Sequence, residues 1–190
     1  MTNDLRDEPF DVEVSSSELV YRGYVWDVRE DRFAYGDEEL VRHYVDHTGA
    51  VAIVAMDDDG RILLIQQYRH PIRSRDWEIP AGLLDVEGED PRDAARRELA
   101  EEADLEAEHW ADLGTFALTP GGSTETIRIF LATGLSATPE AFAREGEEAD
   151  IRLAWVPLDE AVHAVTEGRV HNAAMVLGIM LAAERRRAGA

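Results

Sequence analysis

Two residue types are absent from this sequence of 190 residues, which contains no cysteine and no lysine. Without cysteine, the chain cannot form a disulfide, a thiol nucleophile or a cysteine-ligated zinc site. Without lysine, it cannot form a Schiff base or a phosphate site built on lysine. Long apolar runs are also absent, since the longest extends only from Ala173 to Ala183 and a membrane span needs roughly 20 residues. We therefore expect no membrane partner.

Positive charge is scarce in the chain. It has 19 basic residues against 40 acidic ones, which leaves a formal net charge of -21. Because a nucleic-acid backbone needs a basic face, we expect no nucleic-acid partner. The hydrophobic content of 45% is that of a globular protein, and the polar opening MTNDLRDEPF contains no secretion signal. We expect a cytoplasmic protein, and the charge raises the question of how it could bind an anionic substrate.

The pattern of apolar residues and turns predicts a mixed α/β domain preceded by a small β segment. The β segment should contain three short strands, at Leu19–Val28, Arg32–Tyr35 and Leu40–Val45. A β-hairpin should follow, with strands Ala50–Met56 and Arg61–Tyr68 around an Asp-Asp-Asp-Gly turn. A loop should start at Ala81, and further strands are expected at Trp77–Ile79, Trp110–Leu118, Thr126–Ala132 and Ile151–Val156.

The clearest helix start in the sequence is Asp90-Pro91. Asp caps a helix N-terminus well, and Pro is favoured at the first helical position. This helix should extend from Pro91 to about Ala103. Two more helices are expected near the C-terminus, Leu158–Glu167 and Asn172–Arg187, and Asn172 should be the N-cap of the second.

Three glutamates share one face of the first predicted helix. Glu98, Glu101 and Glu102 are three and four positions apart, which brings them together at 3.6 residues per turn. Clustered carboxylates beside the buried side of a helix suit a hard cation such as Mg²⁺ or Mn²⁺. Since 40 of the 190 residues are acidic, a solvated acidic face explains the same three residues from composition alone.

The residues around these glutamates favour the metal site. From Gly82 to Leu105 the chain reads GLLDVEGEDPRDAARRELAEEADL. This resembles the Nudix box, a glycine and a glutamate followed by the run REUxEExGU, in which U is aliphatic. The matching residues are Gly82, Glu89, Arg97, Glu98, Leu99, Glu101, Glu102 and Leu105.

The match to the box has two departures. One residue more separates Gly82 from Glu89 than in the general pattern, and Asp104 replaces the usual glycine after the two glutamates. The extra residue falls in a loop, where insertions are tolerated. Asp104 should adopt the positive φ of a helix end at a cost of about 1 kcal/mol or less. Neither departure affects a metal-ligand position.

The chain also resembles the ADP-ribose pyrophosphatase branch of the Nudix hydrolases from about Tyr21 to Gly178. The segments that carry this similarity are GAVAIVAMDDDG, QQYRHP, WEIPAGLLD, LATGL, EEADIRLAWVPLDEA and HNAA. The resemblance implies a Nudix-type α/β/α sandwich with a mixed sheet at residues 49–190. It also implies a homodimer, in which an antiparallel β segment at residues 1–48 serves dimerisation and substrate contacts.

The resemblance further implies the residues of a metal site. Glu98 and Glu102 would be the principal ligands of Mg²⁺ or Mn²⁺. The other metal contacts would be Glu101, the backbone carbonyl of Ala81 and, farther out, Glu89. Gly82 and Arg97 would be structural positions of the box, with Arg97 orienting the glutamates.

A general base is implied outside the box, in the acidic stretch from Glu145 to Asp150. Glu148 matches its position, with Glu147 as the alternative. A solvated acidic turn is the other interpretation of this stretch.

Five residues are implied to contact the substrate: Tyr24, Trp26, Arg69, Glu78 and Glu125. Tyr24 and Trp26 would stack on adenine, although aromatic residues of a strand also fit a core or a dimer interface. Arg69, together with Arg73 and Arg75, would form a positive cluster suited to phosphate, while Arg73 and Arg75 also fit as ordinary surface residues. His43 and His47 would lie about 13 Å apart on a strand, so we interpret them as structural.

These features together predict metal-dependent hydrolysis of ADP-ribose to AMP and ribose 5-phosphate. Cations that bridge the pyrophosphate would cancel its charge and lower the pKa of a bound water, whose proton a carboxylate then removes. An acidic protein can thus bind a small anion through metal. Two alternatives remain, namely hydrolysis of other nucleoside diphosphate sugars and a non-catalytic Nudix-fold sensor of ADP-ribose that regulates a partner.

Overall fold

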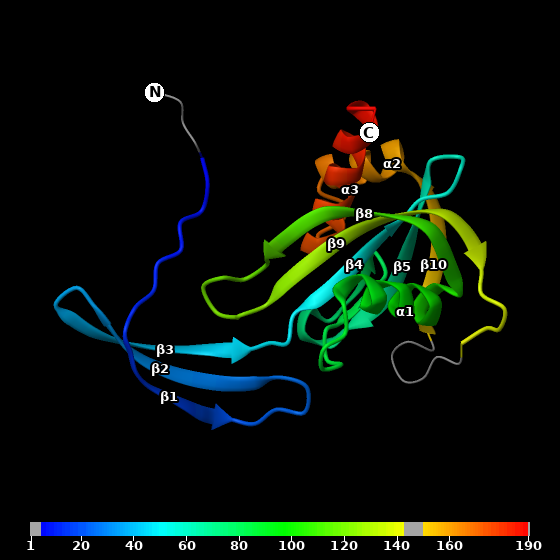
Figure 1. The fold of residues 1–190 in the computed structure, drawn as a ribbon. Coiled ribbons are helices and arrows are strands. Elements are labelled where there is room, and N and C mark those ends of the chain that lie inside the picture. The colour runs from blue at the N-terminus through cyan, green and yellow to red at the C-terminus, as the bar shows by residue number, and fades with distance from the viewer. Residues whose placement is uncertain (1–4, 143–149, 190) are drawn as a thin grey trace. The chain divides into compact units, whose positions relative to one another are not determined.

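The structure is a computed structural model that describes residues 5–142 and 150–189 (Figure 1). The chain divides into two compact units. The first unit combines the N-terminal part up to His47 with the loop Thr119–Thr124. The second unit contains Thr48–Leu118 and the chain from Glu125 onward.

The first unit is built on a three-stranded antiparallel sheet in the order β1-β2-β3, which confirms the expected N-terminal β segment. Its strands are β1 (Val14–Tyr21), β2 (Asp27–Tyr35) and β3 (Glu38–Asp46). None of the residues in these strands is buried. The loop Thr119–Thr124 lies along β3, where the Val45 N–H donates to the Gly122 carbonyl at 2.9 Å.

The expected strand Leu19–Val28 is wrong in its middle, because the chain turns at residues 22–26, between β1 and β2. The Gly23 N–H donates to Asp27 Oδ1 at 3.2 Å across this turn. A Cβ atom at Gly23 would lie 1.9 Å from the Trp26 carbonyl oxygen, so the turn requires glycine. Val25 and Trp26 are exposed in this turn, and an apolar pattern alone could not distinguish it from a strand.

The second unit contains two sheets with strand orders β7-β4-β9-β8 and β10-β5-β6. The first sheet is mixed, as expected, because β4 is parallel to β9 and antiparallel to β7. The strands are β4 (Ala50–Ala55), β5 (Arg61–Arg69), β6 (Ser74–Glu78), β7 (Ala81–Leu83), β8 (Leu105–Ala117), β9 (Thr126–Ala137) and β10 (Arg152–Pro157). A short 3-10 helix, His70–Ile72, joins β5 to β6.

The two strands expected in a hairpin, and the turn between them, are confirmed. Their expected pairing is wrong, because β4 and β5 belong to different sheets and share only the bridge Met56–Ile62. Every residue of β4 is buried, so both edges of this strand need backbone partners. β9 supplies one, and β7 supplies the other. The expected loop at Ala81 is therefore also wrong, since Ala81–Leu83 is the strand that completes this pairing.

Helices cover both faces of the mixed sheet and confirm the α/β/α sandwich (Figure 1). Ala52 and Val54 of β4 face a core with α2 (Leu158–Thr166) and α3 (Ala173–Arg187), while Val51 and Ile53 face a second core with α1 (Pro91–Ala103). This division follows from the alternation of side chains along a strand.

Close packing and capping fix α3 on the sheet. A Cβ atom at Gly178 would lie 2.8 Å from Val54 Cγ2, so glycine lets the helix approach β4. The Asn172 side chain accepts from the Met175 N–H at 3.0 Å and is the expected N-cap. Within the described ranges, no helix is both long enough and apolar enough to cross a membrane.

Candidate active site

Local capping fixes the limits of α1, the helix that carries the box glutamates. Asp90 Oδ1 accepts from the Arg92 N–H at 2.9 Å, and Pro91 is the first helical residue, as the sequence predicts. The helix ends at Ala103. Asp104 then has a φ of 55°, which confirms the positive φ expected at this position. The Asp104 carboxylate accepts from the Phe142 N–H at 2.7 Å, so its side chain also binds a distant segment.

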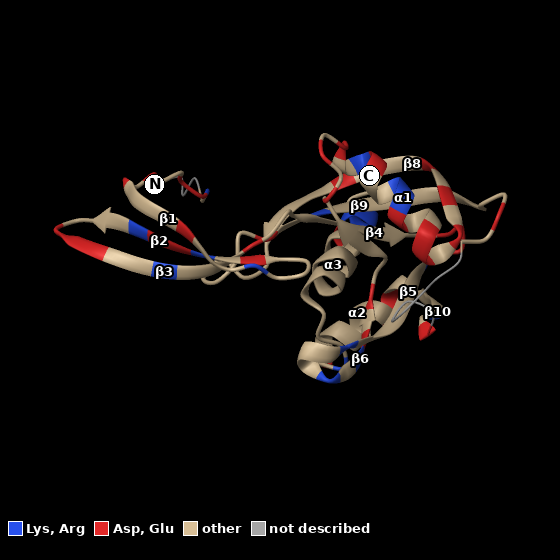
Figure 2. Cartoon of the chain, turned by 90° about the horizontal axis from the view of Figure 1, so that it is seen from below, with Lys and Arg blue, Asp and Glu red and all other residues tan. Residues whose placement is uncertain are grey.

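The buried face of α1 determines where its glutamates lie. Ala94, Ala95 and Leu99 are fully buried against the sheet, and the two alanines allow a close approach. Glu102 is on the edge of this face and is only 7% exposed. The ribbon of α1 carries both basic and acidic residues (Figure 2).

Strand β7 lies beside two of the box carboxylates. The Ala81 N–H donates to Glu102 Oε2 at 2.9 Å. A Cβ atom at Gly82 would lie 1.9 Å from the carboxyl carbon of Glu98, so that carboxylate occupies the space which glycine leaves open. The fold thus brings Glu98 and Glu102 to consecutive residues of one short strand.

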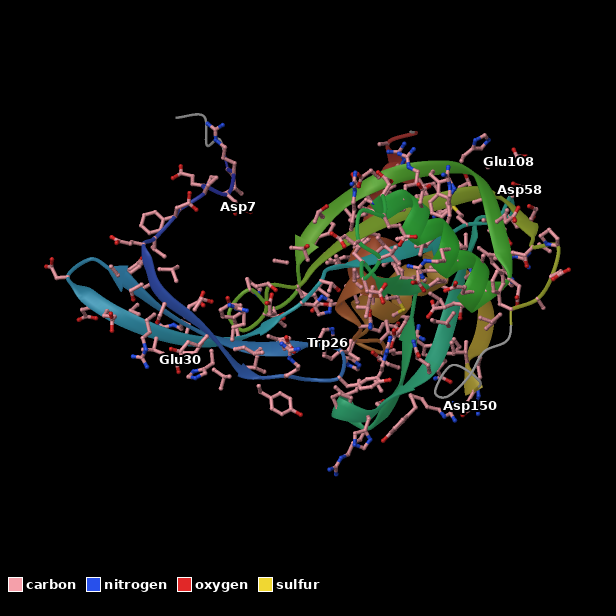
Figure 3. All side chains as sticks on the ribbon, turned by 60° about the horizontal axis from the view of Figure 1, so that its bottom comes forward. Asp7, Trp26, Glu30, Asp58, Glu108 and Asp150 are labelled. Atoms are coloured by element: carbon pink, nitrogen blue, oxygen red, sulfur yellow. The ribbon has the colours of Figure 1, made fainter. Side chains whose placement is uncertain are left out.

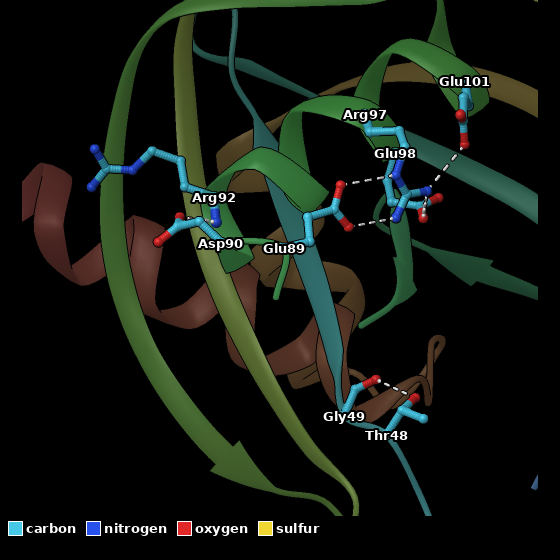
Figure 4. Close-up of polar contacts among 8 residues, drawn as sticks. All are labelled: Thr48, Gly49, Glu89, Asp90, Arg92, Arg97, Glu98 and Glu101. Atoms are coloured by element: carbon cyan, nitrogen blue, oxygen red, sulfur yellow. Dashed lines mark hydrogen bonds and ion pairs between the residues drawn. The ribbon is translucent and has the colours of Figure 1, made fainter. Parts of the chain in front are cut away.

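Arg97 lies among the other glutamates of the box (Figure 4). It forms two hydrogen bonds to Glu89, at 3.3 and 3.1 Å. It also donates to Glu98 at 2.5 Å and to Glu101 at 3.3 Å. The hydrogen bonds that Arg97 donates to Glu89 and the negative charge of Glu98 raise the pKa of the Arg97 guanidinium, which stays charged. This is the arrangement expected of a residue that orients the glutamates.

The environment of Glu98 suits a cation. Burial raises the pKa of the Glu98 carboxyl, and it outweighs the opposing charge of Arg97, while nearby Glu101 raises the pKa further. Additional positive charge would stabilise the ionised form, and carboxylate oxygens are the donors that Mg²⁺ and Mn²⁺ prefer. The donor set therefore fits a divalent cation, although the described residues include no group of three acidic or histidine side chains in a metal-binding arrangement.

Glu78 and Arg69, both implied to contact the substrate, form an ion pair across the β5–β6 ladder, in which Arg69 is opposite Ser74 and Glu78 is opposite Ile65. Arg69 Nε and Nη2 donate to the two oxygens of Glu78, both at 2.7 Å. Gln67, which is also buried, donates to Glu78 at 3.4 Å. Glu78 is only 3% exposed, whereas Arg69 reaches the surface. The Glu78 carboxylate therefore fixes the guanidinium of Arg69.

The expected positive cluster of Arg69, Arg73 and Arg75 is wrong for Arg75. In the β5–β6 ladder Arg69 is opposite Ser74, while Arg75 is opposite Tyr68, so Arg69 and Arg75 face opposite sides of the sheet. Arg75 instead forms an ion pair with Asp150. The alternation of side chains along β6 is the physical reason for this separation.

The aromatic residues implied to stack on adenine are on the surface of the first unit. Tyr24 is fully exposed, and Trp26 is 46% exposed, so neither belongs to a core of this chain. Trp26 is labelled in Figure 3. Its ring stacks on that of His47, with ring centroids 5.4 Å apart and an angle of 24° between the rings. His43 has a different partner, since its Nε2 lies 2.9 Å from Glu30 Oε2.

Of the remaining implied residues, Glu125 is within the described structure, and Glu147 and Glu148 are not. Glu125 is partly buried and directly precedes β9. Glu147 and Glu148, the candidate general bases, are outside the described residues. Two partners were missed by sequence reasoning, Gln67 beside Glu78 and His47 beneath Trp26. The position of Gln67 two residues before Arg69 places both on one face of β5, which is a signal for the first.

A model of the NUDIX domain matches residues 46–176 of the chain. The chain belongs to the NUDIX family. This Nudix chain is 44% identical to the ADP-ribose pyrophosphatase of Mycobacterium tuberculosis, over 90% of this chain and 82% of that protein. It is 34% identical to the methanol dehydrogenase activator of Bacillus methanolicus, over 90% of this chain and 91% of the activator.

A solved structure of an ADP compounds hydrolase has the same Nudix fold. It matches with a TM-score of 0.82 and covers 97% of this chain and 98% of the other. The sequences are 21% identical, so this likeness concerns the fold alone.

Proposed function

We propose that the protein hydrolyses the pyrophosphate of ADP-ribose to give AMP and ribose 5-phosphate. The observation that carries the proposal is the 44% identity to an ADP-ribose pyrophosphatase over nine-tenths of this chain. The packing of Glu98 and Glu102 against strand β7 supports it, because two carboxylates at one edge of a core are a suitable place for a cation that binds pyrophosphate.

The residues that would hold Mg²⁺ or Mn²⁺ are those of the box and of β7. Glu98 and Glu102 would be the principal ligands, and Glu101, the Ala81 carbonyl and Glu89 would complete the set. A bound divalent cation supplies Lewis acidity toward the phosphate oxygens and lowers the pKa of a water. The raised pKa of Glu98 supports this assignment, since its buried carboxylate gains from a positive charge.

The general base is assigned to Glu148, with Glu147 as the alternative. A carboxylate in either position would take the proton from the attacking water. Glu148→Gln and Glu147→Gln distinguish the two, because only the variant that lacks the base should lose turnover while ADP-ribose binding is retained.

Recognition of the substrate would use both units of the chain. Trp26 and Tyr24 offer aromatic surfaces for adenine. Arg69, fixed by Glu78, offers a guanidinium for a phosphate, so Glu78 would act through Arg69. Glu125 is a further substrate-side acid.

The N-terminal segment of residues 1–48 would serve dimerisation with a second copy of the chain. The absence of buried residues in strands β1 to β3 supports this assignment, as does the exposure of Val20, Tyr21 and Val25. Replacing Val20 and Val25 by Glu should convert a dimer to a monomer in sedimentation experiments. A wild-type protein that sediments as a monomer would refute the dimer. The cytoplasmic location stays a prediction.

The test of the proposed activity is incubation with Mg²⁺ and a panel of ADP-ribose, ADP-glucose, GDP-mannose and NADH. We expect AMP release to be fastest from ADP-ribose. Preference for another member would support hydrolysis of a different nucleotide sugar. Binding of ADP-ribose without turnover of any member would support the sensor instead. The non-catalytic sensor is kept as the second candidate function because the chain is also similar to a protein named as an activator of methanol dehydrogenase.

A further inference from the structure

The exposed ring of Trp26 has an aromatic support in the first unit. One face of the indole lies against the imidazole of His47, and the small angle of 24° between the rings makes this a stacked contact. Nearly half of Trp26 remains exposed. Tyr24, two residues earlier, is fully exposed. Of the two aromatic residues, Trp26 is therefore the one whose orientation this contact fixes.

Thr124 holds the backbone of His47. The His47 N–H donates to Thr124 Oγ1 at 2.8 Å, and the Thr124 N–H donates to the Val45 carbonyl at 3.0 Å. These bonds attach the loop Thr119–Thr124 to the end of β3, within the same unit. The position of His47 thus depends on a loop more than 70 residues away in sequence.

We propose that His47, held by Thr124, is a positioning residue that keeps Trp26 ready to stack on the nucleobase of the substrate. This inference rests on the assignment of Trp26 to adenine in the proposed function. His47 then has a role in substrate binding beyond a structural one, and the Thr124 hydroxyl contributes to binding because it holds the backbone of His47.

The physical reason is preorganisation. An exposed tryptophan without a support has several rotamers, and binding a base must select one of them at a cost in side-chain entropy. A ring stacked beneath the indole reduces that cost before the base arrives. The aromatic stack on the other face of Trp26 can then form with every purine, since each base has a π-face.

The experiment measures AMP affinity through the fluorescence of Trp26, without metal and without turnover. His47→Ala should weaken AMP binding about five-fold, on the scale of one aromatic contact. His47→Phe, which retains a ring, should stay within about two-fold of wild type. Thr124→Val should weaken binding about two-fold, while Thr124→Ser, which keeps the hydroxyl, should not. Hydrolysis by His47→Ala should show a raised KM for ADP-ribose rather than a lowered kcat.

Two controls separate positioning from a loss of structure. His43→Ala removes a histidine of β3, in the same unit, that does not stack on Trp26, and it should leave AMP affinity unchanged. The chain has four tryptophans, so each variant is also made with Trp26→Phe. His47→Ala should change the tryptophan emission spectrum of the protein that retains Trp26, and it should not change the spectrum of the protein that carries Trp26→Phe.

The outcomes of these measurements are distinct. Equal AMP affinity of wild type and His47→Ala, or failure of the wild type to bind AMP, would overturn the inference. If AMP binding responds as expected but no nucleotide sugar is hydrolysed, the proposed activity fails and the role of His47 stands. If ADP-ribose is hydrolysed and His47→Ala changes neither KM nor AMP affinity, only the inference fails.

Discussion

The two units of the chain are stabilised in different ways. All the buried apolar residues of the described structure belong to the second unit, where two cores lie on either side of the mixed sheet. The strands of the first unit are joined by backbone hydrogen bonds and contain no buried residue. A three-stranded sheet needs an apolar face covered to be stable alone. We therefore expect the unit that carries the Nudix box to be stable by itself, and the first unit to need contacts beyond its own strands.

The same comparison separates two parts of the proposed function. The box carboxylates are in the second unit, on a helix fixed by packing and by caps at both ends. The aromatic residues proposed for base recognition are in the first unit and are exposed. Changes to the box glutamates should thus affect kcat, and changes to the aromatic residues of the first unit should affect KM.

The largest expected effect is that of Glu102→Gln in the second unit. The amide keeps an oxygen that can accept from the Ala81 N–H, so the fold should remain, but a charged metal ligand is lost. We expect turnover of ADP-ribose to fall at least about 100-fold with a melting temperature close to that of wild type. Glu106→Gln, at an exposed position of β8, is the control. Near-normal turnover by Glu102→Gln would show that the metal assignment is wrong.

Ile53→Ala compares the stability of the two units directly. Ile53 is completely buried in β4, and its truncation should lower the free energy of unfolding by about 2–4 kcal/mol. Leu19→Ala, at a position 40% exposed in β1, should cost less than about 1 kcal/mol. Urea denaturation monitored by circular dichroism measures both values. Similar losses for the two variants would contradict the difference between the units.

Gly82→Ala should disturb the site with a smaller effect on stability. The added methyl group would overlap the Glu98 carboxylate, which must move away from β7. We expect a loss of about 1–3 kcal/mol in the free energy of unfolding and a fall in kcat. Gly121→Ala is the matched control in the first unit, since nothing lies within 4 Å of its Cβ position. If the two variants have equal activity, Glu98 does not need its place beside β7.

The smallest expected effect is that of Asp90→Ala at the start of α1. This change removes the side chain that accepts from the Arg92 N–H, and it should cost about 1 kcal/mol. Asp90→Asn, which keeps a capping oxygen, should cost only a few tenths of that amount. Thermal unfolding of the two variants measures the difference, and an equal loss in both would contradict the role of the cap.

Features with local causes could be predicted from the sequence. The start of α1 at Asp90-Pro91, the positive φ of Asp104 and the Asn172 cap follow from residues next to them in the chain. The proximity of Glu98 and Glu102 follows from the helical period. The resemblance to the Nudix box also indicated what surrounds these two glutamates, because Gly82 of the box is the position at which β7 passes close to the helix.

Features that depend on distant partners could not be predicted in this way. The buried run at Ala50–Ala55 indicates a strand, but it does not say that the partners are β7 and β9 instead of β5. Burial of Glu78 depends on Arg69 from the neighbouring strand. The stack of Trp26 on His47 requires a turn and a loop that meet only in the folded unit.

Asp104 shows that one residue can serve the backbone and the tertiary structure at once. Glycine would adopt the positive φ with less torsional strain, but it has no side chain to bind the Phe142 N–H, which is 38 residues away. The carboxylate links the end of the box helix to the segment after β9 as a non-covalent cross-link. Asp104→Gly should therefore relieve torsional strain at the helix end but remove the hydrogen bond to Phe142. The most frequent residue of a motif is thus not always the best one for a particular chain.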